Sequence, residues 1–202
     1  FIKTKVCDVR EKLPFDNEKF QGCFSHMLYC MAITNSNLKN LDNEICRILK
    51  TNGINIYTVP ELDLRVKGAS KVIYDRSFSN NVKLVSKIGD ICINNFHKNN
   101  IGTVIKHIPG HGHAKVDSHK LTPTVNIKYK QLINKDFAAF KNKKSLLAMT
   151  AHIIYKNIDP DNPATHSKKI ISLIRKNIKF KNIIMTDDIS MKSLKLSIKE
   201  NT

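Results

Sequence analysis

The sequence has few cysteines and no pair of them at a metal-binding spacing. Its 202 residues include five cysteines, an odd number, and no Cys-x-x-Cys pair. Disulfide frameworks and structural zinc sites both depend on paired cysteines, so the sequence argues against each of them. The pattern fits a reducing compartment, and we expect a cytoplasmic protein.

Long apolar runs are also absent. No stretch approaches the roughly 18 consecutive apolar residues that a membrane-spanning helix needs, so we expect no membrane partner. No secretory signal is visible. Because the chain begins at Phe1 rather than at methionine, we expect it to be a piece of a longer product.

Acidic residues are scarce, and lysine far outnumbers arginine. Aspartate and glutamate number 17 against 34 basic residues, which gives a formal net charge of +17. Nucleic-acid-binding proteins usually cluster their basic residues and interleave aromatic ones. Here the lysines are spread over the whole length, which favours solvated faces and makes a nucleic-acid partner unexpected. Recruitment of a polyanion by the charge is the alternative.

From about residue 50 the sequence alternates short apolar strands with helical stretches. This pattern is typical of βα units around a parallel sheet. It predicts the α/β class with a (β/α)8 TIM-barrel type, present as a partial barrel of about four βα units. Residues 1–45 do not share the pattern and form a poorly assigned N-terminal segment, whereas residues 46–202 form the partial barrel. The predicted strands are 54–59, 103–105, 146–149 and 182–185, and the predicted helices are 81–98, 128–142 and 167–177.

Polar clusters follow each predicted strand. They lie at residues 60–65, 106–107, 150–152 and 186–188. Catalytic groups of barrels and doubly wound sheets come from loops at the carboxyl ends of the strands. The clusters therefore indicate a site at that end, although polar residues also follow strands that carry no site.

Residues 106–119 hold four histidines, an aspartate, two lysines and two glycines. Imidazoles exchange protons near neutral pH, and glycines allow sharp turns. Asp117 could fix the tautomer of His119 and raise its pKa, so the pair could act as general acid and then general base. A surface loop with a chance Asp and His is the alternative.

The last strand runs into Asp187 and Asp188. One carboxylate there could be a nucleophile or stabilise a cation, while the other caps a helix that begins near Ser190. A capping role alone is the alternative. Arg76 and the Lys106-His107 pair could donate hydrogen bonds to substrate oxygens, although Arg76 could instead form a local ion pair or turn.

Taken in order, these clusters resemble the bacterial β-N-acetylglucosaminidases of glycoside hydrolase family 3, which recycle cell-wall muropeptides. The Lys-His-x-Pro-Gly-His-Gly motif, closing in Asp-Ser-His, is highly specific, and the resemblance covers about residues 50–202. The matching segments are 59–63 (Val-Pro-Glu-Leu-Asp), 75–78 (Asp-Arg-Ser-Phe), 106–112, 117–119, 150–152 (Thr-Ala-His) and 186–191 (Thr-Asp-Asp-Ile-Ser-Met).

The resemblance implies a retaining hydrolase of terminal β-linked N-acetylglucosamine without metal or organic cofactor. Asp187 would be the nucleophile, and His119 paired with Asp117 the acid/base, in place of the usual second carboxylate. The sugar hydroxyls would be bound by Arg76, Lys106 and His107.

The sequence departs from the family pattern in several places. Glu61 stands where the family has valine, Tyr74 replaces a glycine, and an Asp-x-Glu-Gly-Gly-Arg motif that serves the sugar is absent. The chain would hold the fourth to seventh strands of the barrel. We therefore expect open sheet edges, an incomplete sugar site and an inactive chain.

The residue pattern is also compatible with two other functions. His107, His111, His113, Asp117 and His119 resemble the ligands of a metal-dependent hydrolase by composition, although their spacing is loose. The chain could also be a decayed, non-catalytic fragment or a binding protein.

Overall fold

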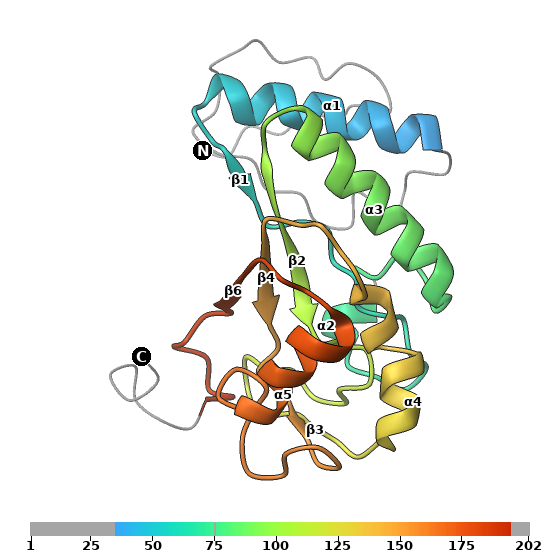
Figure 1. The fold of residues 1–202 in the computed structure, drawn as a ribbon, viewed down its shortest axis with the longest axis vertical. Helices are drawn as coiled ribbons and strands as arrows, with labels where there is room; N and C mark the ends of the chain where they lie inside the picture. Colours follow the sequence, from blue (N-terminus) through green and yellow to red (C-terminus); the bar gives the residue numbers. More distant parts are fainter. Residues whose placement is uncertain (1–34, 75, 195–202) are drawn as a thin grey trace.

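The protein is built around a four-stranded parallel sheet. The computed structural model describes residues 35–74 and 76–194. Neighbouring strands pair in the order β1-β2-β4-β6, and every pair is parallel (Figure 1). This arrangement confirms the predicted parallel βα units. The strands are β1 (Ile56–Tyr57), β2 (Gly102–Ile108), β4 (Leu147–Thr150) and β6 (Ile183–Thr186).

A second, two-stranded sheet joins the loops that follow β2 and β4. It pairs β3 (Thr124–Val125) in parallel with β5 (Ile154–Tyr155). Further backbone bonds extend the pairing, because Ile154 N donates to Pro123 O at 2.9 Å and Lys156 N to Val125 O at 3.0 Å. The long loop after β2 is therefore attached again to the protein at Pro123.

The helices follow the predicted order with two breaks. The helix predicted at 128–142 is a short α-helix followed by a 3₁₀ turn, and the one predicted at 167–177 ends as a π-helix. Side chains cap the helices that were predicted most closely: Asn81 accepts from Leu84 N and Ser167 from Ile170 N, both at 3.1 Å. The helices are α1 (Asn35–Thr51), α2 (Lys71–Tyr74), α3 (Val82–Lys98), α4 (Tyr129–Asn134), η2 (Phe137–Phe140), α5 (Lys168–Leu173) and η3 (Ile174–Ile178).

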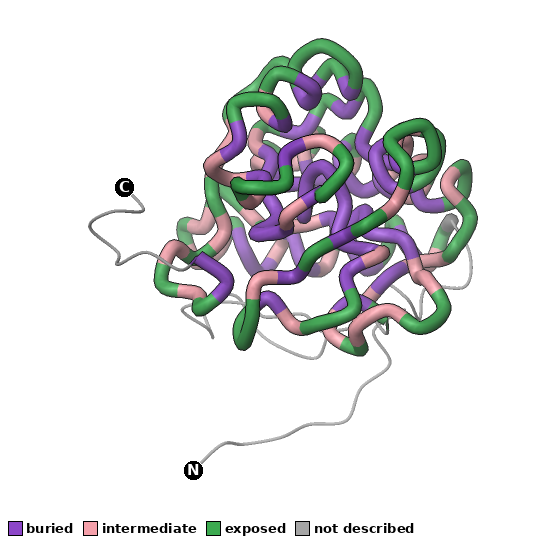
Figure 2. The backbone as a smooth tube through the Cα atoms, turned by 90° about the horizontal axis from the view of Figure 1, so that it is seen from below, coloured by how far each residue is buried: buried purple, intermediate pink, exposed green. Residues whose placement is uncertain are grey.

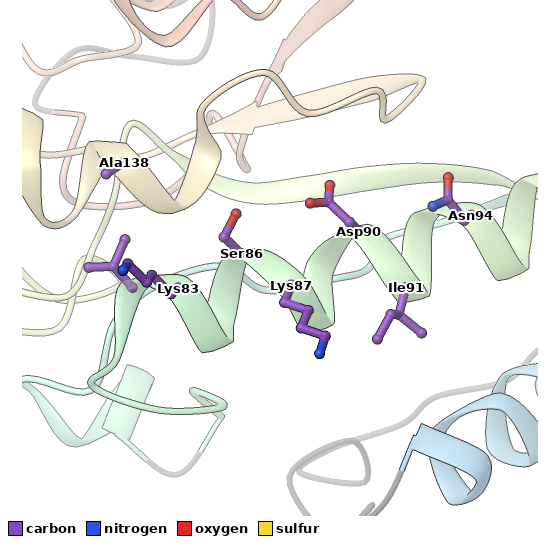
Figure 3. Close-up of a pocket in the computed structure, with 8 residues that line it drawn as sticks. Lys83, Ser86, Lys87, Asp90, Ile91, Asn94 and Ala138 are labelled. Atoms are coloured by element: carbon purple, nitrogen blue, oxygen red, sulfur yellow. The ribbon is translucent and has the colours of Figure 1, made fainter.

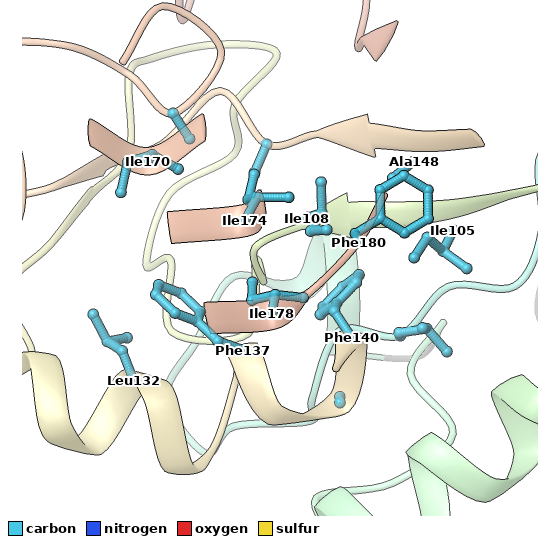
Figure 4. Packing of buried hydrophobic residues seen from close by; sticks show 14 of the residues in the cluster. Ile105, Ile108, Leu132, Phe137, Phe140, Ala148, Ile170, Ile174, Ile178 and Phe180 are labelled. Carbon is cyan, nitrogen blue, oxygen red and sulfur yellow. The ribbon is translucent and has the colours of Figure 1, made fainter. Parts of the chain in front are cut away.

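The main hydrophobic core lies between the sheet and the helices after β2 and β4. Figure 2 shows the buried segments inside a shell of exposed loops, and Figure 4 shows side chains of η2 and η3 packing toward β2 and β4. Phe137 meets Tyr155 edge to face at 5.3 Å between ring centroids. Apolar strands buried in this way give the continuous hydrophobic runs seen in the sequence.

A second apolar cluster joins α1 and α3, which lie side by side at the top of Figure 1. Ile45 and Cys46 of α1 pack there with Phe96 of α3, whose ring lies 5.6 Å from that of Tyr57. Helix α1 crosses the boundary that the sequence analysis drew between residues 45 and 46, so residues 35–45 pack with the βα units. Residues 1–34 of the predicted N-terminal segment lie outside the described residues.

Two surface features bear on the expected partners. Among the described residues, β6 pairs only with β4, and its Ile183 is 59% exposed, in keeping with the expected open edge. In the same part of the chain we find no helix with the length and apolarity that a bilayer crossing requires.

Replacing Phe96 with alanine should lower the free energy of unfolding by about 3–5 kcal/mol, because the fully buried ring connects α1, α3 and β1. Denaturant titration followed by circular dichroism measures the change. Leu84→Ala on the same helix, where the side chain is 45% exposed, is the control and should change stability by less than about 1 kcal/mol. Equal losses in the two variants would contradict the assigned packing of α3.

Candidate functional site

The predicted site residues gather at the carboxyl ends of the parallel strands. Lys106 and His107 lie within β2, which extends three residues beyond its predicted end, and the register with β4 shifts between Lys106 and Ile108. A parallel bridge between Glu61 and Lys106 continues the pairing of β1 with β2. The chain after β1 therefore runs beside Lys106 and His107.

A buried aspartate after β1 organises this end of the sheet. Asp63 is fully buried and accepts three N–H groups: His107 Nδ1 at 2.7 Å, His107 N at 3.1 Å and His111 N at 2.6 Å. Burial alone raises the pKa of Asp63, but His107 and His111 hold that pKa below its ordinary value. The carboxylate is thus kept ionised without contact with water.

His107 links Asp63 to the predicted nucleophile. Burial on its own lowers the pKa of His107, but the neighbouring Asp63 carboxylate raises the pKa above its ordinary value. Its Nε2 lies 3.8 Å from Oδ2 of Asp187, whose side chain is 20% exposed. The histidine therefore lies between one buried carboxylate and one accessible carboxylate, and both favour its protonated form.

The two adjacent aspartates after β6 have different surroundings. Oδ1 of Asp188 accepts from Ser190 N at 2.8 Å and Ser190 Oγ at 2.6 Å, so Asp188 caps a turn and Asp187 faces His107. The helix expected near Ser190 does not form up to Leu194, where the described residues end.

His152, which follows β4, holds the same segment. Its Nε2 donates to Asp188 O at 3.0 Å, and its Nδ1 lies 2.7 Å from Thr165 Oγ1. Burial lowers the pKa of His152, which favours the neutral ring that this pair of contacts needs. The sequence alone indicated no role for this histidine.

Arg76 contacts a buried glutamate that the sequence analysis did not assign to the site. Its Nη2 forms an ion pair with Oε2 of Glu61, a residue only 7% exposed. Burial and the nearby Asp63 raise the pKa of Glu61 to about 7, against the lowering effects of His107, Arg76 and Lys106. Burial and the charge of Arg76 lower the pKa of Lys106. The three predicted sugar-binding cations thus surround one buried carboxyl group.

Asp117 and His119 form the predicted pair. Asp117 Oδ1 accepts from His119 N at 2.9 Å and from His119 Nδ1 at 2.7 Å, and the ring is 58% exposed. Slight burial raises the pKa of Asp117, but the hydrogen bonds from His119 hold it below its ordinary value. The arrangement leaves Nε2 of His119 available to exchange a proton.

The Asp117–His119 loop lies against the segment that follows β6. Thr122 Oγ1 donates to Ser193 O at 2.6 Å. The pKa of Asp188 is lowered chiefly by its hydrogen bonds from Ser190 and to a lesser extent by the rings of His152 and His119. His119 is therefore within electrostatic range of the residue next to Asp187.

The histidines of the metal-site alternative are directed to separate partners. His113 Nδ1 pairs with the buried Asp136 at 2.7 Å, and His111 Nε2 lies 3.4 Å from Ser118 Oγ. Gly110 adopts φ +143°, and a Cβ there would lie 2.8 Å from Asp136 Cβ, so this turn needs glycine to approach Asp136.

One group among the described residues has three ligand atoms within 4.8 Å of one another: Glu61, Asp63 and His107. Asp63 already accepts three N–H groups, and Glu61 faces the guanidinium of Arg76. Two cations, Arg76 and Lys106, also lie beside Glu61. These contacts fit a network of ion pairs better than a set of metal ligands.

A separate cavity of about 480 Å³ lies on α3 (Figure 3). It is lined by α3 and Ala138 and includes none of the predicted site residues. The functional end of the sheet is therefore identified by its charged groups rather than by this cavity.

Comparison with known proteins identifies related sequences. Residues 27–201 match the model of the glycosyl hydrolase family 3 N terminal domain. The chain is 31% identical over 147 residues to a beta-hexosaminidase of Aromatoleum aromaticum, covering 71% of this chain and 41% of the relative. It is 34% identical over 145 residues to a beta-hexosaminidase of Haemophilus influenzae, covering 69% and 40%. The chain thus spans about two fifths of these relatives.

Solved structures share the fold. A family 3 beta-N-acetylglucosaminidase from Paenibacillus sp. str. FPU-7 superposes with a TM-score of 0.77 at 27% identity, covering 83% of this chain and 33% of that one. Zinc-bound CbsA from Thermotoga neapolitana gives 0.76 at 30% identity, covering 92% and 41%. These matches confirm the predicted partial TIM-barrel type of α/β fold. The predicted roles of Asp187, Asp117, His119, Arg76, Lys106 and His107 stay predictions.

The stability of the protein should depend on His111 in mildly acidic solution. Burial lowers the pKa of His111 to about 4, so between pH 6.5 and pH 4 the unfolded chain binds a proton there and the folded chain does not. The free energy of unfolding should therefore decrease as the pH is lowered from 6.5 to 4, and His111 should account for at most about 3 kcal/mol of that decrease. Denaturant titrations at several pH values should give a smaller fall for His111→Gln than for the wild type.

The control is Asn94→Ala, which removes an exposed side chain that does not titrate and retains the buried imidazole. Its pH dependence should follow that of the wild type. If the free energy of unfolding changes equally with pH in His111→Gln and in the wild type, His111 is not held neutral in the folded protein.

Proposed function

Because the chain belongs to the glycosyl hydrolase family 3 N-terminal domain family, we propose that it supplies catalytic strand ends of an enzyme that removes terminal β-linked N-acetylglucosamine. The observation that carries this proposal is the position of Asp187. Its carboxylate follows β6 and lies 3.8 Å from a histidine ring that the buried Asp63 favours in the charged form. An accessible carboxylate at the end of a strand is a candidate nucleophile.

The proposed reaction is a retaining double displacement. An oxygen of Asp187 bonds to the anomeric carbon while the glycosidic carbon–oxygen bond breaks, and His119 gives its proton to the leaving oxygen. Water then attacks the anomeric carbon, His119 takes the proton from that water, and the bond to Asp187 breaks. Asp117 holds His119 by its Nδ1, which leaves Nε2 for both proton transfers.

Substrate recognition is assigned to Arg76, Lys106 and His107, whose N–H groups suit sugar hydroxyls. The relatives named beta-hexosaminidase and beta-N-acetylglucosaminidase support N-acetylglucosamine as the sugar. We further propose that the natural substrate is a cell-wall muropeptide, taken up in peptidoglycan recycling. The cytoplasm is proposed as its location, a choice supported by the free, buried thiols of Cys46 and Cys92.

The full chain should bind N-acetylglucosamine but hydrolyse its chromogenic 4-nitrophenyl β-glycoside slowly or not at all, because the sugar site is expected to be incomplete. Amide chemical shifts in NMR titrations should move at Lys106, His107 and Asp187, and binding should weaken about tenfold in Lys106→Ala. Lys83→Ala on α3 is the control.

Absence of sugar binding by the wild-type chain would contradict the proposed function. Turnover that disappears in Asp187→Ala would support hydrolysis and overturn the expected inactivity. Turnover that persists in Asp187→Ala would show that another residue is the nucleophile.

A further inference from the structure

Glu61 occupies an unusual place for a glutamate. It is 93% buried behind the predicted sugar-binding residues, where the resembling family has a valine. Its backbone bridges to Lys106, and its carboxylate meets the guanidinium of Arg76. The side chain of Arg76 is 25% exposed, so part of it is accessible to solvent while it pairs with Glu61.

The neighbouring carboxylate cannot hold Arg76 in the same way. The carboxylate oxygens of Asp63 accept hydrogen bonds from His107 and His111. The other ring nitrogen of His107 faces Asp187. Arg76 and Lys106 are close enough that Arg76 lowers the pKa of Lys106. Without a carboxylate between them these cations would repel each other in a poorly solvated place. Glu61 is placed to offset that repulsion.

We propose that Glu61 is a positioning residue, which fixes the guanidinium of Arg76 from behind so that its outward N–H groups meet the sugar. This inference rests on the proposed function, since it assigns Arg76 to the sugar. An arginine side chain loses much conformational freedom when it binds a neutral hydroxyl, and a buried partner removes that freedom beforehand. Glu61 thus acts on substrate affinity through Arg76 and does not touch the substrate.

The arrangement predicts a pH dependence with a definite sign. Burial and Asp63 raise the pKa of Glu61 to about 7, while His107, Arg76 and Lys106 act against that rise. Above pH 7 Glu61 is ionised and holds Arg76, whereas at pH 6 it is largely protonated. Sugar affinity should therefore increase from pH 6 to pH 8. A glutamate that competed with the sugar for Arg76 would produce the opposite change.

The test compares four proteins of residues 1–202: wild type, Glu61→Gln, Glu61→Asp and Glu44→Gln. Glu44 pairs with Arg47 on α1 at 3.0 Å, so Glu44→Gln is a matched control that breaks a glutamate–arginine pair outside the site. Two quantities are measured at pH 6 and pH 8: rotation of the Arg76 guanidinium by ¹⁵N NMR, and the dissociation constant of N-acetylglucosamine by calorimetry. His107 also titrates, so the comparison between variants at each pH isolates Glu61.

At pH 8 the Arg76 guanidinium should rotate slowly in the wild type and in Glu44→Gln, and faster in Glu61→Gln. The dissociation constant at pH 8 should be about tenfold higher in Glu61→Gln than in the wild type, and at pH 6 the two proteins should differ little. Glu61→Asp should recover part of the affinity. If Glu61→Gln does not fold, the wild-type pH series and Glu61→Asp decide the question.

Unchanged Arg76 rotation in Glu61→Gln, or sugar affinity that stays equal or increases, would overturn the inference and leave the proposed function intact. A wild-type chain that binds no N-acetylglucosamine at either pH would overturn both. If that chain also shows slow Arg76 rotation that Glu61→Gln abolishes, the Glu61–Arg76 pair is a structural ion pair with no role in sugar binding.

Discussion

The carboxylate of Asp63 is the interaction on which the functional end of the sheet depends. A fully buried carboxylate is strongly unfavourable unless donors surround it, and here His107 and His111 supply three N–H groups. These bonds join the segment after β1, strand β2 and the histidine-rich loop. They also favour the protonated form of His107, whose ring lies 3.8 Å from Asp187, so a buried group acts on the exposed end of the site through His107.

In the candidate site, acidic and basic side chains alternate, although the protein as a whole has a large excess of positive charge. Glu61 and Asp63 are buried among Arg76, Lys106 and His107, and each of these pairs is shielded from bulk water. Most of the lysines that the structure describes are exposed, where salt screens them and where they contribute little to specificity. The chemistry therefore depends on a few enclosed carboxylates rather than on the net charge of +17.

The sequence was sufficient for elements whose signals are local. Helix α3 begins after Asn81 as predicted, because apolar periodicity and a capping side chain agree there. The predicted 128–142 helix breaks near Asp136. This residue packs against Gly110 and pairs with His113, and both are tertiary contacts. Glu61 escaped prediction for the same reason: only the fold shows that it is buried against Arg76. The Asp117–His119 contact was predictable because it spans two residues.

The small β3–β5 sheet fixes the distance between the two ends of the loop at residues 109–123. Strand β2 holds one end of residues 109–123, and the β3–β5 pairing holds the other. The backbone between them is therefore fixed at both ends. An insertion or deletion within it cannot be absorbed by sliding either strand, since both registers are set by their neighbours. Any change in the length of this segment must instead displace the residues within it, which include His119, the proposed proton donor.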